Sequence, residues 1–186
     1  MYSFKPIIEF IKATFPGEDL IPLHAPNFSG NEKKYVCDAI DSTFVSSVGP
    51  FVDKFEQMMT SIAGTKKAVA VVNGTSGIQV ALRLAGVRDG DEVITQALTF
   101  IATVNAIAYN GATPVFLDVD RDTMGLSPFA LETFLVDNCE IRETGCFNKK
   151  TNRRIAACLP MHSFGFPVRL NELIEICEKW HIPLVE

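Results

Sequence analysis

The sequence has few of the features that mark membrane, secreted or nucleic-acid-binding proteins. No apolar run approaches the roughly 20 residues that a membrane span requires, and the segment Met1–Lys5 begins neither a signal-peptide core nor a cleavage site. No run of basic residues is longer than Lys149–Lys150, and the net charge is −5, so composition gives no support for nucleic acid as a partner. These absences predict a cytoplasmic chain.

Cysteine is sparse and scattered. An odd number of isolated cysteines is typical of reduced thiols rather than of a disulfide framework. Cys139 and Cys146 are the pair to consider as metal ligands, but no second Cys/His pair has zinc spacing. We therefore expect unpaired thiols and no metal. The five cysteines are Cys37, Cys139, Cys146, Cys158 and Cys177.

Strand-like and helix-like segments alternate regularly from residue 68 onward. The strand-like runs are 68–72, 92–96, 114–118, 155–159 and 182–185, and the helix-like segments are 75–85, 100–110, 127–137 and 170–180. Strands that are apolar throughout are typical of buried parallel strands. The β-α-β-α order therefore predicts an α/β fold with a mostly parallel sheet and helices on both faces. A chain of 186 residues that is 47% hydrophobic can form one domain or part of a larger one.

The N-terminal part reads as helices joined by loops. Helical patterns cover 4–14, 31–43 and 50–63. Pro50 suits the first turn of a helix, and Gly64 suits the end of one. Further along, the polar insertion 138–154 is expected to form either a mobile loop or a small hairpin.

The segment Asn73–Ser76 is the strongest local signal for a ligand. It joins an expected strand to an expected helix, so backbone N–H groups at the helix start can bind a phosphate. Gly74 lets a ligand approach the backbone closely, and Thr75 and Ser76 add hydroxyl groups. The alternative is an ordinary capped helix with Thr75 or Asn73 as the N-cap. The turn matches neither a P-loop nor a dinucleotide-binding fingerprint.

Other candidate residues follow three of the expected strands. Phe100 would lie at the carboxyl edge of the sheet, where α/β proteins bind ligands, but with 14 phenylalanines in the chain a core position is favoured on composition alone. His162 lies at the same edge, to act on a substrate or to hold a loop. Asp118 and Asp120 are potential metal ligands, although capping of the following turn is favoured.

Taken in order, these pieces resemble the DegT/DnrJ/EryC1/StrS family of sugar aminotransferases. The family uses pyridoxal 5′-phosphate (PLP) on the type I aminotransferase fold. Each motif is weak alone, but five in register are specific. The motifs are 46–50 with 55–56, 73–77, 90–94, 99–107 and 111–120.

The resemblance implies roles for individual residues. Gly74, Thr75 and Ser76 match the family turn that holds the PLP phosphate. Phe100 matches the aromatic residue that stacks on the pyridine ring. Three more residues are carried over to the nucleotide-sugar substrate, namely His24, Ser46 and Ser47.

The segments 23–26 and 30–36 look closest to one subgroup of the family. Members of that subgroup aminate C4 of a UDP-linked 4-keto-6-deoxy-N-acetylhexosamine in bacterial surface-glycan biosynthesis, with glutamate as the common amino donor. The resemblance also implies a homodimer for the full-length protein. No nucleic acid, membrane or metal partner is expected.

The chain stops at Glu186, before the family's aspartate and lysine that engage the cofactor ring. We therefore expect residues 1–30 to form an N-terminal helix and loop, and residues 31–186 to form the N-terminal part of the PLP-binding large domain. On this interpretation the chain carries no catalytic residue and is inactive by itself. The alternatives are a non-catalytic fragment that binds PLP or a nucleotide sugar, a PLP-dependent sugar dehydratase of the same family, and a different α/β enzyme such as a nucleotide-binding oxidoreductase, which the missing glycine fingerprint disfavours.

Overall fold

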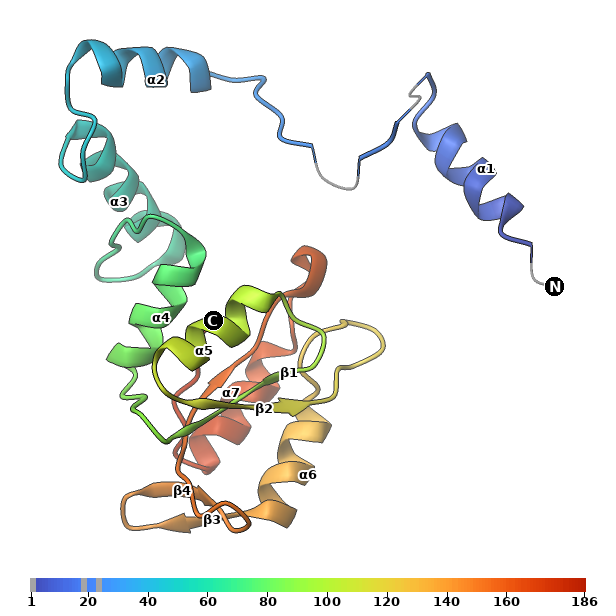
Figure 1. Cartoon of the computed structure of the whole chain (residues 1–186), viewed down its shortest axis with the longest axis vertical. Helices are drawn as coiled ribbons and strands as arrows, with labels where there is room; N and C mark the ends of the chain where they lie inside the picture. The colour runs from blue at the N-terminus through green and yellow to red at the C-terminus, as the bar shows by residue number, and fades with distance from the viewer. Residues whose placement is uncertain (1–2, 18–19, 23–24) are drawn as a thin grey trace. The chain divides into compact units, whose positions relative to one another are not determined.

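A computed structural model describes residues 3–17, 20–22 and 25–186. The chain divides into two compact units, Met1–Ala70 and Val71–Glu186, each described here by itself. The first unit contains helices α1 (Lys5–Thr14), α2 (Glu32–Asp41) and α3 (Pro50–Ala63) (Figure 1). All three were predicted. Within the described ranges, no helix has the length and apolar character needed to cross a bilayer.

The ends of α3 have the predicted chemistry. Pro50 occupies its first turn, where the missing N–H costs no helical hydrogen bond. Gly64 follows its last residue with φ +64°, in the left-handed conformation that glycine adopts without strain. Asn31, a residue type that commonly caps helices, precedes α2, but its side chain makes no capping hydrogen bond.

The second unit is built on a three-stranded parallel sheet. The strands are β1 (Glu92–Gln96), β2 (Thr113–Leu117) and β5 (Ile155–Leu159), in the order β2-β1-β5. In the central strand Ile94 lies opposite Val115 on one side and Cys158 on the other. Three predicted strands are thus confirmed, with β2 one residue earlier than expected.

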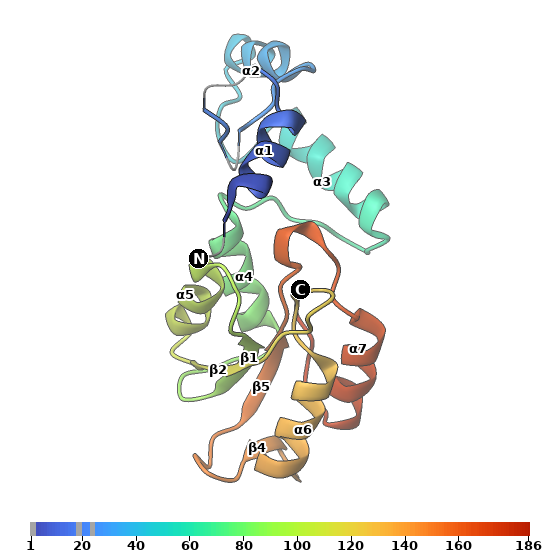
Figure 2. The ribbon, with the colours of Figure 1, turned by 90° about the vertical axis from the view of Figure 1, so that its right-hand side faces the viewer.

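Helices cover both faces of this sheet, as predicted (Figure 2). The helices α4 (Gly74–Leu84) and α5 (Ile101–Tyr109) cover one face, and α6 (Pro128–Asn138) and α7 (Leu170–Lys179) cover the other. Each face has its own apolar layer. The α4/α5 side buries Leu82, Val93, Ile107 and Leu159, and the α6/α7 side buries Ile94, Leu131, Leu135 and Leu173. Burial of these side chains is the main force holding the layers together.

The polar insertion after α6 forms a small hairpin, one of the two predicted alternatives. Its strands are β3 (Cys139–Arg142) and β4 (Gly145–Asn148), paired antiparallel. The guanidinium of Arg142 lies 4.5 Å from the ring centroid of Phe147, a cation–π contact across the hairpin.

Two of the predicted strands do not form as predicted. The prediction of a strand at 68–72 is wrong, because among the described residues no other strand pairs with it, and Val72 is 88% exposed. The segment 182–185 forms only an isolated parallel bridge, between Leu184 and Cys158. A pattern of apolar residues reports burial potential, but a strand also needs a neighbour for its backbone hydrogen bonds.

Candidate functional site

The candidate site lies at the carboxyl edge of the parallel sheet. The strands β1, β2 and β5 end at Gln96, Leu117 and Leu159, and the segments that follow them share this edge. Helix α5 follows β1 and begins at this edge. Helix α4 precedes β1 in the chain and ends near the start of that strand, so the start of α4 also lies at the carboxyl edge (Figure 2). This is the edge at which open α/β sheets bind ligands.

The turn Asn73–Ser76 opens α4 as an N-cap. The side-chain oxygen Oδ1 of Asn73 accepts a hydrogen bond of 2.9 Å from the backbone N–H of Ser76. Asn73 is therefore the N-cap and Thr75 is not, which decides between the two caps considered from the sequence. The cap occupies only one of the orphan donors at this helix start.

The remaining donors of the turn are free to bind an anion. Within the described residues, no acceptor satisfies the backbone N–H of Gly74 or Thr75, and the hydroxyl groups of Thr75 and Ser76 make no hydrogen bond. A Cβ added at Gly74 would meet no atom within 4 Å, so the space over this backbone is open. Two amides, two hydroxyls and the positive end of a helix suit a phosphate group.

Phe100 does not lie in the core, contrary to the expectation from composition. It is the residue before α5, and 67% of it is exposed. Its backbone N–H and the hydroxyl of Thr99 donate to the sulfur of Met161, at 3.3 and 3.4 Å. An exposed aromatic ring at the ligand-binding edge can stack on a planar ligand.

Of the residues carried over for a sugar substrate, two belong to the first unit. Ser46 and Ser47 are exposed in the turn before α3, in the first unit, where the Oγ of Ser46 accepts a hydrogen bond of 3.4 Å from the backbone N–H of Val48. His24 lies outside the described residues. Gly74, Thr75, Ser76 and Phe100 all belong to the second unit.

His162 and the two aspartates after β2 have structural partners. The Nδ1 atom of His162 accepts from the Val168 N–H at 3.2 Å, so this histidine holds the loop after β5. Asp118 accepts from its neighbour's N–H at 2.8 Å, and Asp120 lies 3.5 Å from the guanidinium of Arg169. Among the residues that the structure describes, no three His, Cys, Asp or Glu side chains form a metal site.

The buried cysteines are free thiols in two close pairs, Cys139 with Cys146 and Cys158 with Cys177. Within each pair the thiol of Cys139 or Cys158 donates to the sulfur of its neighbour, which together with burial raises the pKa of Cys139 and Cys158 above the ordinary value. The same hydrogen bonds lower the pKa of Cys146 and Cys177. All four cysteines are buried in the apolar layer on the α6/α7 side of the sheet, where they pack as small apolar residues.

One residue of the site was missed from the sequence. Gln96, the last residue of β1, is fully buried. Its carboxamide forms hydrogen bonds with the segments that follow β1, β2 and β5 at the carboxyl edge. The available signal was a glutamine at the end of an otherwise apolar strand. Sequence alone does not say which groups such a side chain meets.

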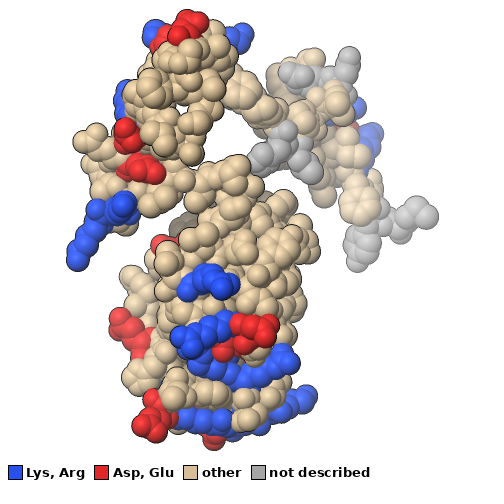
Figure 3. Space-filling view, turned by 60° about the vertical axis from the view of Figure 1, so that its left-hand side comes forward, with Lys and Arg blue, Asp and Glu red and all other residues tan. Residues whose placement is uncertain are grey.

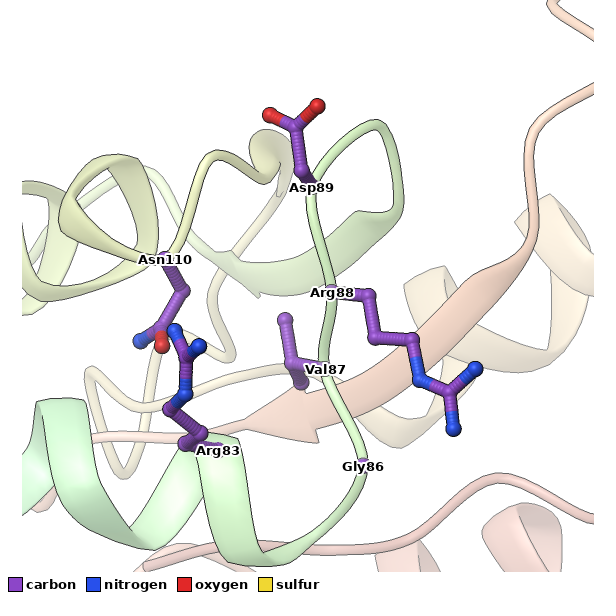
Figure 4. A pocket seen from close by; sticks show the side chains of 6 residues that line it. All are labelled: Arg83, Gly86, Val87, Arg88, Asp89 and Asn110. Atoms are coloured by element: carbon purple, nitrogen blue, oxygen red, sulfur yellow. The ribbon is translucent and has the colours of Figure 1, made fainter.

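A separate hollow of about 430 Å³ lies at the opposite edge, between the ends of α4 and α5 and the start of β1. Arg83 and Asn110 point toward each other there, while Arg88 and Asp89 point away (Figure 4). On the face that Figure 3 shows, basic side chains of the second unit are interspersed with acidic ones. Helix C-termini disfavour anions, so this hollow is a poorer candidate than the turn at Asn73–Ser76.

Comparison with known proteins gives a consistent family. The model of the DegT/DnrJ/EryC1/StrS aminotransferase family matches residues 26–186. Over 166 residues the chain is 36% identical to EpsN of Bacillus subtilis (strain 168), which carries the name of a pyridoxal phosphate-dependent aminotransferase, and 34% identical to GDP-perosamine synthase of Escherichia coli O157:H7. Both alignments cover 89% of this chain but only 40% and 41% of those proteins. The chain thus spans about 40% of the length of these curated relatives.

Solved structures agree with this result. DesV of S. venezuelae, in complex with a ketimine intermediate, is similar with a TM-score of 0.67 and 30% identity, over 83% of this chain and 38% of that one. An aminotransferase from Psychrobacter cryohalolentis is similar with a TM-score of 0.72 and 28% identity, over 88% of this chain and 38% of that one.

Proposed function

The chain belongs to the DegT/DnrJ/EryC1/StrS aminotransferase family, and from that premise we propose that it carries part of the cofactor site of a PLP-dependent nucleotide-sugar aminotransferase. The proposed reaction transfers an amino group from glutamate to C4 of a UDP-linked 4-keto-6-deoxy-N-acetylhexosamine. The observation that supports it is the Asn73–Ser76 turn, with free backbone donors at the start of α4.

The residues present fit the cofactor. In this proposal the phosphate of PLP accepts hydrogen bonds from the N–H groups of Gly74 and Thr75 and from the hydroxyls of Thr75 and Ser76. This donor set is already ordered by the Asn73 cap, so little entropy is lost when a dianion binds. Phe100, exposed at the same sheet edge, stacks on the flat ring.

When bound, PLP supplies an electron sink for amino transfer. The contribution of this chain's own residues is to hold the phosphate and to orient the ring. The nucleotide sugar is assigned to His24, Ser46 and Ser47, on the family resemblance alone. The proposed partners are therefore the nucleotide sugar, the amino-acid donor and a second copy of the full-length protein.

Calorimetric titration with pyridoxamine 5′-phosphate tests the phosphate assignment without any turnover. Thr75→Ala should weaken binding about tenfold, because a hydrogen bond to a charged group contributes roughly 1.5 kcal/mol. Thr144→Ala, an exposed threonine in the hairpin turn, is the matched control and should bind as the wild type does.

Gly74→Ala separates ligand binding from folding. The added methyl group meets no protein atom, so stability should stay the same or rise by up to about 1 kcal/mol. The methyl does enter the space assigned to the phosphate, so affinity should fall at least tenfold. Unchanged affinity in both Thr75→Ala and Gly74→Ala, or no binding by the wild type, would overturn the proposal.

The sugar assignment has its own test. UDP should bind more tightly than GDP or TDP, and Ser46→Ala with Ser47→Ala should weaken UDP binding while leaving pyridoxamine 5′-phosphate binding unchanged. Tighter binding of GDP would reject the UDP-linked substrate. Sedimentation of the full-length protein as a monomer at micromolar concentration would reject the homodimer.

A further inference from the structure

Gln96 is a fully buried polar side chain at the point where the central strand ends. A carboxamide offers two donor hydrogens and two acceptor lone pairs. Its oxygen Oε1 accepts from the backbone N–H of Met161 at 2.9 Å and from that of Leu126 at 3.0 Å. Its nitrogen Nε2 donates to the Leu98 carbonyl and to the Ser163 hydroxyl, both at 3.0 Å. Every hydrogen-bonding position of this carboxamide is therefore used.

These four bonds reach three separate segments. Leu98 belongs to the segment after β1, Leu126 to the segment after β2, and Met161 with Ser163 to the segment after β5. The carboxamide is thus a single rigid group that fixes the relative positions of all the connections leaving the carboxyl edge. Buried networks of this kind specify one geometry because a partly satisfied alternative is costly.

Two further contacts connect this hydrogen-bond network to the backbone at Phe100. Met161, held by Gln96, accepts through its sulfur from the N–H of Phe100 and the hydroxyl of Thr99. Leu98, also held by Gln96, lies two residues before Phe100. Since the Phe100 ring is largely exposed, its place is set by this backbone and not by packing around the ring.

We propose that Gln96 is a positioning residue for the cofactor ring, acting through Leu98 and Met161 on the loop that presents Phe100. This proposal rests on the proposed function, since it concerns the same site. The role requires a side chain that donates and accepts at once. An ionised carboxylate cannot donate, and an apolar side chain leaves the Met161 and Leu126 amides unpaired.

The test compares two ligands, pyridoxamine 5′-phosphate and inorganic phosphate, on purified chain variants. Gln96→Met removes the hydrogen bonds while keeping a side chain of similar length. We expect it to weaken pyridoxamine 5′-phosphate binding about fivefold, the scale of one aromatic stacking contact, and to leave phosphate binding unchanged. Gln57→Met, at an exposed position in α3, is the matched control.

A double-mutant cycle shows whether Gln96 acts through Phe100. In a Phe100→Ala background, Gln96→Met should have no further effect on pyridoxamine 5′-phosphate affinity, because the ring it orients is gone. Additive losses, or an equal loss of phosphate affinity, would show a general structural role and overturn the proposal.

A milder variant covers the case in which Gln96→Met does not fold. Met161→Leu conserves volume and removes the sulfur acceptor, so it should weaken pyridoxamine 5′-phosphate binding about twofold to threefold and spare phosphate. If Gln96→Met and Met161→Leu bind pyridoxamine 5′-phosphate as the wild type does, while Thr75→Ala still binds it weakly, the role of Gln96 is rejected and the proposed function is not. Absence of Thr75-dependent binding in the wild type would reject the proposed function, and the role of Gln96 with it.

Discussion

Asp91 joins two parts of the amino edge of the sheet through one carboxylate. Its two oxygens accept from the guanidinium of Arg154 at 3.2 and 2.6 Å, and one of them also accepts from the Arg88 N–H at 2.8 Å. Arg154 donates in addition to the Gly86 carbonyl at 2.6 Å. The hydrogen bond with Asp91 raises the pKa of Arg154. A bidentate, largely buried pair of this kind ties the α4–β1 turn to the start of β5.

Asp91→Ala should lower the free energy of unfolding by about 2–4 kcal/mol, because it leaves the Arg154 guanidinium and the Arg88 amide without their partner. The measurement is urea denaturation followed by circular dichroism. Asp89→Ala, two residues away and exposed, should change stability by less than about 0.5 kcal/mol. Equal effects of the two substitutions would show that the pair contributes little.

At the scale of elements, the segment after β2 is tied to α7 by Arg169. Its guanidinium lies 2.7 Å from Asp122 and 3.5 Å from Asp120, and 4.0 Å from Glu172 in the first turn of α7. The hydrogen bond from Arg169 lowers the pKa of Asp122 below its ordinary value. Because the ionised form is favoured in the folded state, the contact stabilises the fold only while Asp122 is charged.

The contribution of Asp122 should therefore depend on pH. It is fully present above the unfolded pKa of about 3.9 and is lost as the pH falls through the lower folded pKa. Urea midpoints of the wild type should exceed those of Asp122→Asn at pH 7, and the difference should be smaller at pH 2.5. The effect is small and salt-sensitive because the pair is exposed. A difference of the same size at both pH values would contradict the ion-pair explanation, and Asp137→Asn, an exposed aspartate of α6, is the control.

At the scale of the whole molecule, the two units differ in the burial of their elements. Helices α1, α2 and α3 contain no buried residue, whereas all five residues of β1 are buried in the second unit. The segment 68–72, at the boundary of the two units, has one hydrogen bond to a side chain, from the Ala70 N–H to Glu56 at 2.8 Å. Stability should therefore be concentrated around the central strand.

Native-state hydrogen exchange followed by NMR checks this distribution. The amides of 93–96 should exchange most slowly, since their strand is buried and lies between β2 and β5. The amides of Val69, Val71 and Val72 should exchange at nearly the rates of an unprotected chain, because no backbone hydrogen bond covers them in the described structure. Protection at 69–72 that approaches the protection of β1 would show that this segment pairs as a strand after all.

Most elements could be predicted from local chemistry. Periodicity located the helices of both units, and Pro50 and Gly64 marked the ends of α3 correctly. The polar turn at Asn73 was recognised because helix starts have recurrent residue preferences. The strand at 68–72 was predicted wrongly and the 182–185 strand was reduced to a single bridge, because pairing depends on residues distant in sequence.

The sequence by itself determined the α/β order and the family, and it predicted a phosphate-binding turn, because these depend on residue types at short spacing. Only the tertiary structure placed Phe100 on the surface and showed Gln96 bonded to Leu98, Leu126, Met161 and Ser163. The physical reason is that a buried polar side chain needs partners, and the fold decides which distant backbone groups come within hydrogen-bond distance.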